Sequence, residues 1–173
     1  MRPESKFVNE IHNSFSHLFR EKAFFIKIPD MPFGKEQREQ LPEYIKYNPV
    51  KPFDIITVVN GKPFAIEAKS CQKSNNFTFT SVTVRQTGNL WLFNKAGGIA
   101  FVAIKASELY SLFIPIEKFI ILKNTFKDTG KLLMSPQSSF AIIQRETYGK
   151  KIWDIEELIT GSTIQSKLAI YTN

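Results

Sequence analysis

The chain has 173 residues, 43% of them apolar and 13% aromatic, which predicts a folded protein with a sizeable core rather than a disordered one. Its one cysteine, Cys71, excludes an internal disulfide framework. No apolar run reaches the roughly 18 residues that a membrane span needs, and "MRPESKFVNE" lacks the apolar core of a signal peptide. We therefore expect a single domain over residues 1–173, a cytoplasmic location and no membrane partner.

The charge is unevenly distributed. The net charge is +7, and no Asp or Glu occurs between Glu67 and Glu108. Five basic residues fall in that interval: Lys69, Lys73, Arg85, Lys95 and Lys105. A contiguous acid-free block is typical of a surface that faces phosphates, so the distribution favours a nucleic acid partner. A basic surface that serves solubility alone is the alternative.

The first two elements follow from the periodicity. In residues 5–22 apolar side chains recur at spacings of three and four, which predicts an amphipathic helix with Glu10 at the margin of its apolar face. Residues 23–28, "AFFIKI", are predicted as a strand. The following stretch, about 29–52, is rich in proline and has no clean period. Its length favours a projecting arm, with a surface loop as the alternative.

Residues 53–69 predict a β-hairpin. Asn60-Gly61 is the strongest short-range signal for a type I′ turn, because both central residues need positive φ. Asp54 would then lie opposite Glu67 on one face, and Lys69 would share that face. The other face would carry a core set: Phe53, Ile55, Val59, Phe64 and Ile66.

Two carboxylates directly opposite one another destabilise an ordinary sheet. A divalent cation such as Mg²⁺ removes this objection, since both groups can be its oxygen ligands. A neighbouring lysine could then activate a water or stabilise charge on a phosphate oxygen. The alternative is a solvated sheet end in which Lys69 pairs with Glu67 and Asp54 opens a strand.

The remaining elements predict a mixed α/β fold. We expect an extended segment at 75–84, a helix at 85–97 that ends at a glycine pair, and a buried strand at 98–106. A strand broken at Pro115 follows in 109–122, with a short helical or extended piece after the break, then a strand at 138–146 and a terminal helix at 150–159. This order predicts a mixed β-sheet with helices on its faces.

The pair "PFD" and "EAK", separated by twelve residues, resembles the signature of the PD-(D/E)XK, or restriction-endonuclease-like, nucleases. Glu10 in "FVNEIHNSF", Gln86 in "VRQTGNLWLF" and the strand "AGGIAFVAI" extend the likeness. This order, over roughly residues 7–120, resembles Holliday junction resolvases, most closely those of the RecU type. It departs from that type at "PFDII", where Ile55 and Ile56 stand in place of a second acid that often lies nearby.

The resemblance implies a role for each matching residue. Asp54 and Glu67 would bind the metal with the Ala68 backbone carbonyl, and Glu10 would join them as a ligand or through a water. Lys69 would be the catalytic lysine beside the attacking water. Gln86 would orient a phosphate or a ligand. Mg²⁺ would be the cofactor, with Mn²⁺ as a substitute.

The resemblance also implies a homodimer that acts on branched DNA, the four-way junction, in recombination and repair near the nucleoid. The proline-rich segment at about 29–52 would be the stalk-like insertion that RecU-type enzymes carry there. Four basic residues are predicted to contact the DNA backbone: Lys27, Lys73, Arg85 and Lys95. For the last three, a solvated surface is the alternative. The absence of a GxxxxGK loop argues against a nucleotide cofactor. Two other functions stay open: another nuclease of the same superfamily acting on duplex or branched DNA, and a non-catalytic DNA-binding module whose acids are structural.

Overall fold

A computed structural model of the chain describes residues 3–29, 51–71, 76–126, 130–147 and 150–160. The predicted stalk-like insertion lies almost wholly outside these residues, and so does Lys73. No helix in the described part of the chain is long and apolar enough to cross a membrane.

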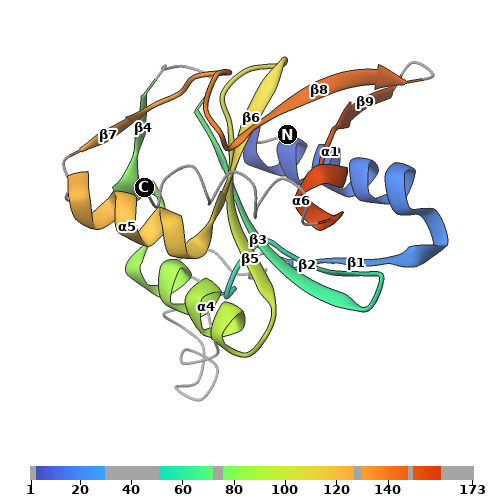
Figure 1. Ribbon diagram of the computed structural model, residues 1–173, viewed down its shortest axis with the longest axis horizontal. Helices are drawn as coiled ribbons and strands as arrows, with labels where there is room; N and C mark the ends of the chain where they lie inside the picture. Colours follow the sequence, from blue (N-terminus) through green and yellow to red (C-terminus); the bar gives the residue numbers. More distant parts are fainter. Residues whose placement is uncertain (1–2, 30–50, 72–75, 127–129, 148–149, 161–173) are drawn as a thin grey trace, which may run out of the picture.

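Seven strands form one mixed sheet in the order β1-β2-β3-β5-β6-β8-β9 (Figure 1). The strands are β1 (Ala23–Lys27), β2 (Ile55–Val59), β3 (Lys62–Ser70), β5 (Ile99–Lys105), β6 (Tyr110–Pro115), β8 (Ala141–Thr147) and β9 (Lys150–Trp153). β3 and β5 pair in parallel, and the other neighbours pair antiparallel. A separate two-stranded sheet joins β4 (Asn76–Thr78) to β7 (Lys131–Leu133).

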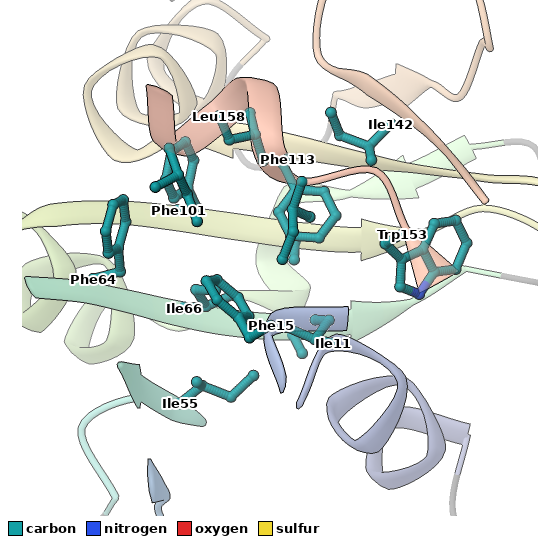
Figure 2. Packing of buried hydrophobic residues seen from close by; sticks show 14 of the residues in the cluster. Ile11, Phe15, Ile55, Phe64, Ile66, Phe101, Phe113, Ile142, Trp153 and Leu158 are labelled. Atoms are coloured by element: carbon teal, nitrogen blue, oxygen red, sulfur yellow. The ribbon is translucent and has the colours of Figure 1, made fainter. Parts of the chain in front are cut away.

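Helices cover both faces of the large sheet. One core contains residues of α1 (Pro3–Phe19) and α6 (Glu156–Thr160), and Figure 2 shows its side chains converging on Ile66 and Phe113. The opposite core contains residues of α4 (Val84–Lys95) and α5 (Ile116–Phe126). Short 3₁₀ turns, η1 (Arg20–Lys22) and η2 (Phe79–Ser81), precede β1 and α4. The predicted fold class, a mixed sheet flanked by helices, is confirmed.

The hairpin register is confirmed over the paired strands. Val59 pairs with Lys62 and Ile55 with Ile66, while Asn60 and Gly61 have φ values of 50° and 77°. The regular ladder ends at Ile55, and the Asp54 N–H donates to the Ile66 carbonyl at 3.1 Å instead of continuing the register.

The predicted face of Phe53 is wrong. It packs edge-on against Phe93 in the core of α4 and α5, not beside Ile55 as its position in the alternation predicts. Strand alternation no longer applies to Phe53, because it precedes the end of the ladder.

The C-terminal part differs most from the prediction. The helix expected over 150–159 is wrong in its first half: residues 150–153 form β9, and only the short α6 follows. Pairing with β8 and the burial of Trp153 against Phe7 override the helical pattern there. The break at Pro115 is confirmed, although the helix after it, α5, continues to Phe126. β7 was not expected.

Candidate active site

Asp54 is held where β2 meets β3. Its Oδ2 accepts a hydrogen bond from the Ala68 backbone N–H at 2.7 Å. Its Oδ1 lies 2.5 Å from the Nζ of Lys51, a residue that the sequence-based prediction did not include. The only signal for Lys51 was its place three residues before Asp54 in "KPFD". The carboxylate is therefore oriented by a backbone amide and neutralised by an ammonium group.

Glu67 is the buried acid of the site, with a side chain that is only 1% exposed. Its Oε1 accepts hydrogen bonds from Lys69 Nζ at 2.8 Å and from Gln86 Nε2 at 2.5 Å. Its Oε2 is buried and has no hydrogen-bond partner within the described part of the chain. A buried carboxylate oxygen without a partner is costly, so this atom is a candidate position for a water or a cation.

The sequence places Gln86 beside Glu67 through a helix cap. Thr83 precedes α4, and its side chain accepts from the Gln86 N–H while Gln86 Oε1 accepts from the Thr83 N–H. This capping box satisfies free N–H groups at the helix start. It also fixes the Gln86 amide, whose Nε2 is left to bind Glu67. One side chain thus joins the start of α4 to the middle of β3.

The Glu67 pKa is raised from 4.5 to about 7. Burial is the largest cause, and the nearby Asp54 carboxylate adds to it, while the positive charges of Lys69 and Lys51 lower the pKa. Asp54 and Glu67 are therefore close enough to repel one another, and the two lysines only partly compensate.

This raised pKa predicts a pH-dependent stability. A carboxyl whose folded pKa lies above its unfolded value contributes its full stability below about pH 4.5 and loses it as the pH rises through about 7. Glu67→Gln cannot ionise, so the metal-free variant should gain on the order of 3 kcal/mol over the unmodified protein between pH 4.5 and pH 8. Urea unfolding of both proteins in a chelator, at several pH values, measures this. A stability difference that stays constant with pH would contradict it.

Glu10 is not brought together with Asp54 and Glu67. Its two oxygens each lie 2.8 Å from the Nζ of Lys105, whose side chain is 1% exposed. Lys105 pairs with Ser70 across β5 and β3, so the two side chains lie on the same face of the sheet. Successive residues of a strand face opposite ways, and Ser70 is three positions after Glu67, so this face is opposite to that of Glu67. A metal role for Glu10 stays a prediction, and the structure places its carboxylate on the α1 side.

The predicted DNA-contacting residues that the structure describes are exposed. Lys27 ends the edge strand β1, and Arg85 and Lys95 lie on α4. The Lys95 ammonium sits 5.6 Å from the centre of the Trp91 ring, which is half-exposed. Trp91 therefore faces outward on α4, whereas Leu90 and Phe93 pack inward.

The residues present fit a hard divalent cation. No group of three or more His, Cys, Asp or Glu residues that could hold a metal occurs in the described ranges. Mg²⁺ does not need one, because it keeps several waters and is commonly held by one or two carboxylates. Asp54, the Ala68 carbonyl and Glu67 Oε2, which has no partner among the described residues, are the oxygen ligands that would hold it. The solvated sheet end is contradicted by the burial of Glu67, although the pairing of Lys69 with Glu67 that it expected is present.

The family model of recombination protein U, RecU, matches residues 12–151, which include Asp54, Glu67, Lys69 and Gln86 but not Glu10. No curated protein matches the chain. Similar solved structures include Hjc, a Holliday junction resolvase from the archaeal hyperthermophile Archaeoglobus fulgidus. It is 18% identical, the match covers 67% of this chain and 75% of that one, and the TM-score is 0.42. By the match of the family model over most of its length, this chain belongs to the RecU family of Holliday junction resolvases, which are endonucleases.

Proposed function

We propose that this chain is a Mg²⁺-dependent endonuclease that resolves four-way DNA junctions by hydrolysing phosphodiester bonds and leaving a 5′ phosphate. The observation that carries the proposal is the buried Glu67 Oε2, which has no partner in the part of the chain that the structure describes and lies in a site shared with Asp54 and Lys69. An acid-rich site next to an acid-free, basic stretch of chain suits a cation and a phosphate together.

Each residue of the candidate site has a distinct role in this reaction. Gln86 holds Glu67 Oε1 and so aims Oε2, while the Ala68 N–H orients Asp54. The metal, held by Asp54, Glu67 and the Ala68 carbonyl, would lower the pKa of a water and neutralise charge on the phosphate. Lys69 lies beside these acids and would orient the attacking water.

The bond changes balance without a further reactant. The oxygen of the water forms a bond to phosphorus as the bond from phosphorus to the 3′ oxygen breaks. The water gives up one proton to solvent as it attacks, and the 3′ oxygen takes up one proton from solvent as it leaves, so the products are a 5′ phosphate and a 3′ hydroxyl. Mn²⁺ would substitute for Mg²⁺, since it also accepts carboxylate and carbonyl oxygens.

Binding would depend on shape and phosphate contacts rather than on base recognition. Lys27, Arg85 and Lys95 are exposed and would contact the DNA backbone, which positions the substrate without reading its sequence. A homodimer would present two such sites to two opposed strands of the junction. Because the substrate is recombining DNA, the expected location is the cytoplasm, at the nucleoid.

Cleavage of matched substrates tests this function. The protein and an Asp54→Ala variant are incubated with a mobile four-way junction and with linear duplex of the same sequence, each with and without Mg²⁺. We expect paired, symmetric nicks in the junction only, dependent on Mg²⁺ and absent in the variant. Equal cutting of the duplex would favour another nuclease activity of the same superfamily. Tight junction binding without cleavage would favour a non-catalytic DNA-binding module.

A further inference from the structure

The candidate site contains two lysines, one for each carboxylate. Lys69 binds Glu67, and Lys51 binds Asp54 at 2.5 Å, with both side chains of the second pair largely buried, 16% and 15% exposed. Both lysines lower the pKa of Glu67, so both ammonium groups act on the same small cluster. The two lysines nevertheless differ in what they leave available to a cation.

Lys69 does not occupy the atom that a metal needs. It shares Glu67 Oε1 with Gln86, and Oε2 stays without a partner among the described residues. Lys51 does occupy such an atom. Asp54 Oδ2 already accepts from the Ala68 N–H, so Oδ1 is the oxygen with more room for a cation, and Lys51 is bound there. A metal ion bound at Asp54 would therefore compete with the Lys51 ammonium for Oδ1.

The lysine side chain suits such an exchange. It carries a compact charge on a flexible four-carbon stem with three rotatable donors, so it can leave one oxygen and reach another nearby without backbone movement. Once a divalent ion neutralises Asp54, a phosphate oxygen of the DNA offers a new anionic partner to Lys51.

We propose that Lys51 binds Asp54 in the metal-free protein and contacts a phosphate oxygen beside the scissile bond in the complex with metal and DNA. The proposal rests on the proposed metal-dependent cleavage and extends it: Lys51 links metal binding to substrate binding. Removal of its charge should have opposite effects on the two ligands, whereas damage to the fold would weaken the binding of both.

The test uses Lys51→Met, which keeps the apolar stem, Lys51→Arg, which keeps the charge, and Lys62→Met as a matched control. Lys62 is exposed beside the hairpin turn, at the other end of β3. Mn²⁺ binding is measured by titration calorimetry without DNA. The KM and kcat for junction cleavage are measured at saturating Mg²⁺, and circular dichroism verifies that each variant folds.

We expect Lys51→Met to bind Mn²⁺ about three- to tenfold more tightly, the effect of losing one competing ion pair. The same variant should show a KM for the junction that is about tenfold higher, the equivalent of one charged phosphate contact, with a smaller change in kcat. Lys51→Arg should restore most of the KM, and Lys62→Met should change neither quantity.

Unchanged or weaker Mn²⁺ binding by Lys51→Met, or an unchanged KM, would overturn the role of Lys51. An unmodified protein whose Mn²⁺ binding equals that of Asp54→Ala would overturn the proposed metal site and the role of Lys51 together. Metal binding that is lost in Asp54→Ala but is the same in Lys51→Met as in the unmodified protein would overturn only the role of Lys51. If Lys51→Met fails to fold, Lys51→Gln takes its place in the same measurements.

Discussion

Lys69→Met is expected to lower kcat for junction cleavage by about a hundred- to a thousandfold while the protein still binds the junction. The Lys69 ammonium lies 2.8 Å from Glu67 Oε1, is 13% exposed, and is the cation nearest to the acid that we assign to the metal. Removing one preorganised charged donor from a water-poor site typically costs a rate factor of about this size. Single-turnover cleavage at saturating protein separates the loss of kcat from any change in binding.

Lys69 also lowers the pKa of Glu67, so its loss should raise that pKa above its value of about 7. At neutral pH part of the lost activity would then be lost metal binding, because a protonated Glu67 is a poor ligand. Cleavage measured at pH 9 and high Mg²⁺ removes this contribution and isolates the direct role of Lys69. Full recovery of activity at pH 9 would contradict that role. Lys62→Met, which removes an equal charge at the far end of β3, should cleave normally.

Lys105→Met is expected to destabilise the protein by about 3–5 kcal/mol. Lys105 is buried, binds both oxygens of Glu10 at 2.8 Å, lies 3.0 Å from Glu108 and sits 5.8 Å from the centre of the Trp153 ring. Without Lys105, the largely buried Glu10 keeps only the exposed Lys6, at 4.0 Å, as an ion-pair partner among the described residues. Removing one partner of a buried ion pair carries a penalty of this size. Urea unfolding at pH 7 in a chelator measures the change in the free energy of unfolding.

The double variant Lys105→Met with Glu10→Leu is the matched control. It removes both charges and should recover much of the lost stability, since a buried pair can often be replaced by apolar residues at little cost. A double variant that is no more stable than Lys105→Met alone would contradict the assignment of the loss to Glu10.

Mn²⁺ binding of Glu10→Gln tests the prediction that Glu10 reaches the metal. A loss of affinity would support that role in spite of the pairing with Lys105.

The hairpin and the helix after it were predictable because local rules specify them. Asn60-Gly61 allows few turn geometries, and the turn sets the pairing that brings Glu67 and Lys69 next to the end of β2. The Thr83–Gln86 spacing is a local capping signal, so the position of Gln86 at the start of α4 also follows from the sequence. Alternation then determines which face of β3 each side chain shares.

Long-range contacts decided the rest, since periodicity and turn chemistry carry no information about distant partners. Glu10 and Lys105 are 95 positions apart, and only the packing of α1 on the sheet pairs them. The backbone N–H of Trp153 donates a hydrogen bond to Ser14 Oγ, 139 positions away, and this bond helps to hold β9 where the sequence pattern predicts a helix. The near-complete burial of Glu67 depends on β5 and α4 covering β3, and so does the lack of a partner for its Oε2 within the described ranges. The sequence alone therefore determined that Asp54, Glu67 and Lys69 meet beside the hairpin. Tertiary packing brought Lys51 to Asp54, paired Glu10 with Lys105 instead, and determined which carboxylate oxygens are available to a metal.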